Sequence, residues 1–194
     1  MSDNTKAQIV EAFKELLNEK EYGKITISDI AERCNISRQT FYYHFKNIFD
    51  MVVWIFEQDT KSDPRNSGGY VPWRLLVRES FEYCQQNKSL IMQVLRSPER
   101  EKLSSYFIEF SIKKISEALM IKTDGRMDPK DVDFIARVYA YAYSGIILKW
   151  ISEGMPDDGI ELAEKIDTVV SASMNPVIEA LMKKSAENKK PETL

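Results

Sequence analysis

Hydrogen-bonding side chains are concentrated in the segment SRQTFYYHFK, residues 37–46. Within it, Phe41 and Phe45 lie four residues apart, the spacing at which two side chains pack from one face of a helix. The side chains then left to face outward are Arg38, Gln39, Thr40, Tyr42, Tyr43, His44 and Lys46. Arginine can donate two hydrogen bonds to guanine, and glutamine can pair with adenine in the same bidentate way. The chemistry that this short helix predicts is therefore recognition of DNA in the major groove.

The residues before this helix predict a second helix and a tight turn that would position it. Thr26 can cap a helix, and Asp29, three residues later, can complete a capping box. One apolar face of that helix would be formed by Ile27, Ile30, Ala31 and Cys34. Asn35 tolerates the left-handed backbone of a tight turn, and Ser37 can cap the helix that follows. Residues 26–50 therefore predict a helix–turn–helix, and Thr26 and Ser37, at the two helix starts, join the outward-facing residues as candidate DNA-binding residues.

The charge distribution favours contact with DNA through a limited surface. Residues 33–49 contain three basic residues and no acid, whereas residues 1–60 hold seven basic and ten acidic residues. A purely electrostatic nucleic-acid binder would be basic throughout. The acid-free stretch suits a protein that makes a few phosphate contacts and reads bases with a short helix.

The segment 5–56 resembles the TetR-type family of bacterial transcription regulators. The family pattern has a Thr-led helix with an Ile–Ala pair, a turn, and a helix ending in Tyr-x-His-Phe-Lys. The matching residues here are Thr26, Ile30, Ala31, Tyr42, His44, Phe45 and Lys46. The resemblance implies an operator-binding homodimer in which Tyr42, His44 and Lys46 meet phosphates. The chain departs from the pattern at Ile48, where the family commonly has a lysine that makes a further phosphate contact.

A narrower similarity concerns residues 38–42 and 54–57. Both runs look like the subgroup that includes the activator of dihydroxyacetone kinase genes. Family members usually bind an inducer in the body of the protein, whereas this subgroup implies control by a protein partner. The sequence leaves a small-molecule effector and a regulatory protein open as alternatives.

Apolar residues recur at helical spacing along nearly the whole chain, without an internal repeat or a strand pair. We expect an all-α protein of about nine helices. Residues 1–47 would form the helix-turn-helix DNA-binding domain, and residues 48–194 a larger helical bundle for signal sensing and dimerisation.

Particular segments predict the boundaries inside that bundle. Residues 48–56 are apolar except for Asp50, which predicts a helix that is covered on two sides. Residues 61–72 contain two prolines and two glycines and predict a loop. A long helix is expected from Pro98 to about residue 122, and two more over 131–153 and 159–184, the last with a bend near Pro176.

Aromatic side chains are frequent in the predicted bundle. They can form ordinary core, or they can line an apolar pocket in which hydroxyl groups orient a ligand. The candidate pocket residues are Trp73, Phe81, Tyr106, Phe110, Tyr139 and Tyr143.

The last two long helices carry more apolar surface than one small body needs. The surface can be one-chain core, or two such helices from each of two chains can form a four-helix interface. The candidate interface residues are Val138, Ala142, Ile146, Trp150, Ile166, Val170, Met174 and Val177.

Other functional classes find little support. The single histidine, His44, belongs to the predicted DNA face, and Cys34 and Cys84 have no CxxC spacing, so we expect no metal site and no catalytic triad. No nucleotide-binding glycine motif is present, so no cofactor and no enzyme activity are expected. The N-terminus lacks a signal-peptide pattern and no apolar run is long enough for a membrane span, which predicts a cytoplasmic protein. A helical enzyme or structural dimer that no longer binds DNA stays as the rival class.

Overall fold

The computed structural model describes residues 2–61, 73–156 and 159–188, which form helices and turns with no strand among them. The described helices, in chain order, are α1 (Ser2–Glu19), η1 (Tyr22–Lys24), α2 (Ile27–Arg33), α3 (Arg38–His44), α4 (Ile48–Lys61), α5 (Trp73–Gln86), α6 (Lys88–Leu95), α7 (Arg100–Lys122), α8 (Pro129–Ser152) and α9 (Gly159–Asn188). The predicted all-α class with an N-terminal helix-turn-helix is confirmed. None of these helices combines the length and apolarity needed to cross a membrane.

The chain forms two compact units. One contains α1 to α4 together with residues 89–103, and the other contains α5, residues 104–122 of α7, α8 and α9. The domain boundary expected at residue 47 divides DNA binding from signal sensing and dimerisation, and it stays a prediction. By packing, α4 and residues 89–95 of α6 belong with the N-terminal helices.

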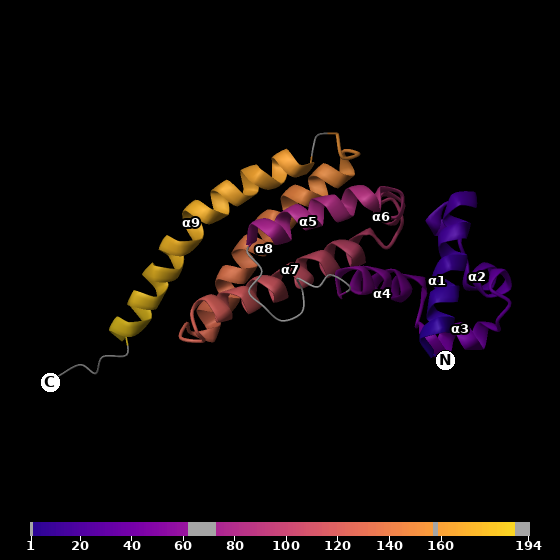
Figure 1. Ribbon diagram of the computed structural model, residues 1–194, viewed down its shortest axis with the longest axis horizontal. Helices are drawn as coiled ribbons and strands as arrows, with labels where there is room; N and C mark the ends of the chain where they lie inside the picture. Colours follow the sequence, from indigo (N-terminus) through magenta and orange to yellow (C-terminus); the bar gives the residue numbers. More distant parts are fainter. Residues whose placement is uncertain (1, 62–72, 157–158, 189–194) are drawn as a thin grey trace. The chain divides into compact units, whose positions relative to one another are not determined.

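The N-terminal unit is built on an apolar stripe of α1, with α2 and α3 beside it (Figure 1). Ile9, Phe13 and Leu16 of this stripe are buried. Phe41 and Phe45 are also buried, as their spacing predicts, and the Phe45 ring lies 5.8 Å from the ring of Trp54 on α4. This aromatic contact fixes α3 against α4.

The same unit includes a tie between residues far apart in the sequence. The Tyr22 backbone N–H donates to Gln93 Oε1 at 2.7 Å, and the Tyr22 hydroxyl donates to a carboxylate oxygen of Glu99. Tyr22 is buried, and its burial raises the pKa of the hydroxyl, which therefore keeps its proton. These bonds fasten residues 89–103 to the turn that precedes α2.

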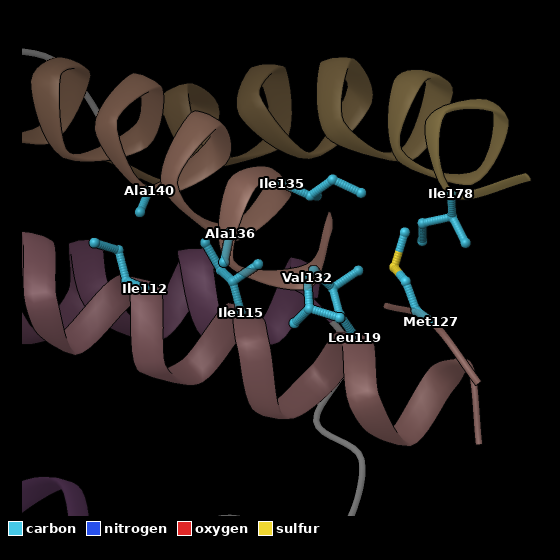
Figure 2. Close-up of a cluster of buried hydrophobic side chains, with 9 residues drawn as sticks. All are labelled: Ile112, Ile115, Leu119, Met127, Val132, Ile135, Ala136, Ala140 and Ile178. Atoms are coloured by element: carbon cyan, nitrogen blue, oxygen red, sulfur yellow. The ribbon is translucent and has the colours of Figure 1, made fainter. Parts of the chain in front are cut away.

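The core of the second unit lies where α7, α8 and α9 meet (Figure 2). Small residues, Ala136 and Ala140, are fully buried on the inner face of α8. The side chains that close this core are Ile112, Ile115, Leu119, Met127, Val132, Ile135 and Ile178. Helix α9 runs along α5 and α8 (Figure 1).

A second set of contacts in this unit depends on Gly159. A Cβ at that position would lie 3.0 Å from Trp150 Cζ2 and 3.1 Å from Phe81 Cδ1. The rings of Phe81 and Trp150 themselves meet at 4.9 Å between centroids. The absence of a side chain therefore lets the start of α9 approach the aromatic residues of α5 and α8.

Several boundaries differ from those that the sequence predicts. Helix α7 begins at Arg100 and not at Pro98, because the Ser97 hydroxyl accepts the Glu99 backbone N–H in a turn before the helix. Helix α4 extends to Lys61, and α9 continues through Pro176 to Asn188. The loop predicted over 61–72 otherwise lies outside the described residues.

Candidate DNA-binding and effector sites

The predicted capping box closes the start of α2. Thr26 Oγ1 accepts the Asp29 backbone N–H at 3.1 Å, and Asp29 Oδ2 accepts the Thr26 backbone N–H at 2.7 Å. The ammonium of Lys20, 2.9 Å from Asp29, and the bonds to Thr26 lower the pKa of that carboxyl to about 2. The box therefore stays ionised and intact near neutral pH.

The turn and the start of α3 also have the predicted local structure. Asn35 has a φ of 53°, in the left-handed region that a tight turn needs. Ser37 Oγ accepts the Thr40 backbone N–H at 3.0 Å, and the two hydroxyl oxygens lie 2.8 Å apart. The first turn of α3 is thus capped by its own side chains, which leaves Arg38 and Gln39 free to face outward.

The polar side chains of α3 gather on its exposed face. Tyr43 is 82% exposed and Tyr42 is 50% exposed, whereas Phe41 is fully buried. The other predicted contact residues are exposed or half-buried, namely Thr26, Ser37, Arg38, Gln39, Thr40, His44 and Lys46. The structure thus brings the predicted set from 37 to 46 to one surface, with Thr26 at the start of the neighbouring helix.

The three basic residues of this region differ in their partners. Arg33 lies 2.6 Å from Glu19 and 3.2 Å from Glu15 of α1, and these carboxylates raise the pKa of its guanidinium. Within the described residues, Arg38 and Lys46 form no ion pair. Arg33 therefore stabilises the fold, and two cations per chain are left for an external anion.

A hollow in the second unit is lined by part of the predicted aromatic set. It takes residues from α5, α7 and α8: Trp73, Leu76, Val77, Ser80, Phe110, Ser111, Lys114, Ile115 and Tyr143. Phe81 lies behind it, 6.5 Å from the Tyr143 ring, and Tyr106 stacks on Phe110 at 6.2 Å. Tyr139 is directed elsewhere, because its hydroxyl lies 2.9 Å from Ser173 Oγ.

Six lining residues were not predicted. Leu76, Val77 and Ser80 follow Trp73 by three, four and seven positions, and Lys114 follows Phe110 by four. Such spacing places these four residues on the same helix faces as Trp73 and Phe110, although it does not show that the packing of the helices brings those faces together. The polar ones, Ser80, Ser111 and Lys114, are missed by a search for aromatic residues alone.

The predicted dimer residues fall into two groups. Val138 is 50% exposed and Ile146 is 41% exposed, and Ala142 and Val177 are exposed too. The apolar surface of Trp150, Ile166 and Val170 is already covered inside the unit, and Met174 packs against its core. We therefore narrow the interface proposal to the exposed group. Further apolar side chains extend that surface: Phe134, Tyr141 and Val169.

The two cysteines are free, but only one is buried. Burial raises the pKa of the Cys84 thiol to about 12. Cys34, which the sequence places on the apolar face of this helix, is only half-buried, because it stands at the end of α2, where its thiol donates to the Ile30 carbonyl at 3.0 Å.

Two family models match the chain. The model described as "Bacterial regulatory proteins, tetR family" matches residues 9–53, and the one described as "Transcriptional regulator C-terminal region" matches residues 72–172. The first match covers the helix–turn–helix, and the second covers all the residues that line the hollow. The families and relatives are regulators of transcription, not enzymes.

Individual relatives agree with these models. The chain is 31% identical over 90 residues to the HTH-type dhaKLM operon transcriptional activator DhaS of Lactococcus lactis subsp. lactis (strain IL1403), which covers 46% of this chain and 48% of that protein, about half its length. It is 22% identical over 199 aligned positions to the uncharacterized HTH-type transcriptional regulator YerO of Bacillus subtilis (strain 168), covering 89% of this chain and 68% of that one.

Solved structures show the same fold. A structure of the dihydroxyacetone kinase operon activator DhaS superposes with a TM-score of 0.61 at 25% identity, over 91% of this chain and 97% of that chain. The TetR family repressor AlkX from Dietzia sp. strain DQ12-45-1b superposes with a TM-score of 0.57 at 20% identity, over 88% and 98% of the two chains. The chain therefore belongs to the TetR family of bacterial transcription regulators.

Proposed function

We propose that this regulator binds a near-palindromic operator as a homodimer and releases it when a small molecule occupies the hollow of its second unit. The observation that carries the DNA part is the exposed face of α3. It combines a capped helix start, two unpaired cations and several hydroxyl and imidazole groups. Of the nearby acids, Glu15 and Glu19 pair with Arg33, and Asp50 accepts the Lys46 backbone N–H.

The exposed residues divide by the chemistry that each can perform. Arg38 and Gln39 stand in the first turn of α3, where recognition helices meet base edges. Tyr42, His44 and Lys46 stand at its other end and are proposed to contact phosphates. Thr26 and Ser37 hold the helix starts, and their hydroxyls can add phosphate contacts from there.

Dimerisation would set the distance between two reading helices. Two such helices must lie about 34 Å apart to enter successive major grooves. The exposed apolar faces of α8 and α9 support a four-helix interface with a second copy. A ligand that favours a different separation would shift the population away from DNA. We propose that this happens in the cytoplasm.

The proposed relay uses the helices that pack in the N-terminal unit. In α4, Met51, Val52, Ile55 and Phe56 are buried, and Trp54 contacts Phe45 with the Lys6 ammonium 5.5 Å from its ring. In α6, Gln93 bonds to Tyr22. Helix α6 is preceded by α5 and followed by α7 in the chain. Both of these helices carry residues that line the hollow. A movement of α5 or α7 can therefore be transmitted to the DNA-binding helices through the connected backbone.

A second candidate is control by a regulatory protein in place of a small molecule. The similarity to DhaS, which is an activator of the dhaKLM operon by its name, favours it. The DNA-binding part of the proposal is common to both.

The direct test is binding of the purified chain to DNA from its own upstream region, measured by fluorescence anisotropy. We expect saturable binding that exceeds binding to a scrambled duplex. Lys46→Ala should weaken binding to both duplexes about equally and reduce the salt slope by about one per chain. Failure to prefer the upstream duplex at any salt concentration would reject the operator proposal for that region.

The relay has its own test. Trp54→Ala should leave operator affinity measurable but change the ratio of affinities with and without effector, because coupling is defined by that ratio. An unchanged ratio would mean that α4 is only part of the core.

A further inference from the structure

We infer that the hollow of the second unit binds a small organic acid, with an apolar body against its walls and a carboxylate at Tyr143, Trp73 and Lys114. The inference rests on the proposed control by a small molecule and names the chemical class of that ligand. It is carried by the unpaired polar atoms of two residues that line the hollow.

Two buried polar groups there lack partners. Tyr143 is 8% exposed, and neither its hydroxyl nor the indole N–H of Trp73 has a hydrogen-bond partner. The two rings meet edge-on at 5.7 Å, and both line the hollow. Buried polar groups in folded proteins nearly always have a partner, so a site with two unpaired ones is built for an outside group.

The unpaired groups require an acceptor. An indole N–H can only donate. Burial raises the pKa of Tyr143, so its hydroxyl keeps a proton to donate. Ser80 lies close enough to oppose this shift of the pKa, but its hydroxyl and that of Tyr143 are not joined by a hydrogen bond. The protons of Ser80 and Ser111 are already donated to backbone carbonyls at 2.7 and 2.8 Å.

The charge of the hollow is positive. Lys114 lines it, with its ammonium 5.9 Å from the centre of the Phe110 ring. Its ammonium forms an ion pair with the half-exposed Glu117 at 3.6 Å, and no Asp or Glu is among the lining residues. An anionic acceptor would satisfy Tyr143 and Trp73 and give Lys114 a second carboxylate partner.

The walls select the rest of the ligand. Leu76, Val77, Phe110 and Ile115 offer carbon atoms only, against which a sugar or a phosphate ester would leave polar groups unpaired. The hollow is small, since its volume of about 340 Å³ includes the solvent at its open mouth. A carboxylate on a short aromatic or aliphatic body fits both limits.

The test is calorimetric titration of the full chain with benzoate, phenylacetate and hexanoate, each beside its neutral amide. At least one acid should bind saturably, about tenfold or more tighter than its amide, because the lost interaction is a charge-assisted hydrogen bond. Tyr143→Phe and Lys114→Met should each weaken that acid about tenfold or more. Lys113→Met removes the same charge from an exposed neighbouring position and should leave the affinity unchanged.

Tyr143→Phe should not lower the melting temperature without ligand, since the hydroxyl that it removes has no partner. If that variant misfolds, Trp73→Phe removes the indole N–H instead and should weaken the acid similarly. Absence of binding by every acid, equal binding of acid and amide, or equal loss in Lys113→Met would overturn the inference and leave the hollow to water. Operator affinity is measured in parallel: an acid that binds as expected without changing operator affinity supports the acid site and rejects the proposed ligand control.

Discussion

Helices α3 and α8 both leave large side chains in water, but the chemistry that they expose is opposite. The exposed face of α3 carries Arg38, Gln39, Tyr42 and Tyr43, which can donate or accept hydrogen bonds. On α8, Phe134 is 62% exposed beside other apolar residues. A polar exposed face suits a hydrated, charged partner such as DNA, whereas an apolar one is stabilised only by another apolar surface.

The two helices are also held in place differently. Helix α3 is short and depends on the Ser37 cap and on the burial of Phe41. Helix α8 is long, and its inner face closes on α7 through Ala136 and Ala140. The short helix is thus positioned by local hydrogen bonds, and the long one by core packing. Substitutions on the exposed side of either helix can therefore test binding without removing what holds the helix.

The largest effect is expected for a charge on the apolar face of α8. Ile146→Glu should abolish the dimer, because a two-fold interface would bury the new carboxylate twice without a counter-ion. The cost should be at least about 3 kcal/mol of association free energy. Sedimentation velocity at micromolar concentration measures the change from dimer to monomer.

The matched control is Lys130→Glu, which places the same charge on an exposed, polar position of α8. It should remain a dimer. A wild-type chain that sediments as a monomer, or an Ile146→Glu variant that stays dimeric, would remove the interface proposal.

The response to salt concentration should next distinguish the exposed face of α3 from the apolar face of α8. If each chain of a dimer neutralises one phosphate through Lys46, operator affinity should fall about tenfold between roughly 50 and 200 mM salt. The affinity of the two chains for each other, if it depends on apolar faces, should stay constant or increase over the same range of salt concentration. Anisotropy and sedimentation in identical buffers measure both. Parallel loss of the two affinities would mean that DNA binding simply follows dimer dissociation.

A smaller and more selective effect is expected within the basic residues. Arg38→Ala should cost about 1–3 kcal/mol at particular base pairs and relax the preference there. Arg33→Ala should leave that preference intact, since Arg33 is engaged by Glu15 and Glu19. Competition binding with a set of single-base-pair operator variants measures this difference. Equal effects of the two substitutions on base preference would contradict the assignment of Arg38.

Local features of the fold could be predicted from the sequence. The cap at Thr26, the turn at Asn35 and the cap at Ser37 each depend on residues within a few positions, so their types and spacing determine the backbone. The same holds for Phe41 and Phe45, whose burial follows from a helical repeat.

Features that depend on distant residues could not be predicted. The bond from Tyr22 to Glu99 joins positions 77 apart, and no periodicity indicates it. Trp150 and Val138 both fit an apolar repeat on α8, yet one is covered by its own chain and the other is not. An apolar repeat shows that a helix face must be covered, but it does not show whether the same chain or a second copy covers it. For this reason, half of the predicted interface residues lie in the core. The position of Lys114 in the hollow likewise depends on how α5 and α8 pack beside α7.

The smallest effect concerns acid, and it distinguishes a surface held by charges from one held by packing. The pKa of Asp29 is about 2 in the fold against an ordinary value of 3.8, so its ionised form contributes stability above about pH 4 that is lost as the pH falls toward 2. Asp29→Asn should lower the urea midpoint near pH 6, and its difference from the wild type should shrink as the pH approaches 2. The difference will be small, since the side chains of Asp29 and Lys20 are partly exposed and their interaction is screened by salt. Val138→Ala on α8 has no titrating partner, so its difference from the wild type should not change with pH. If the Asp29→Asn difference also stays constant down to pH 2, the ionised capping box does not help to hold α2.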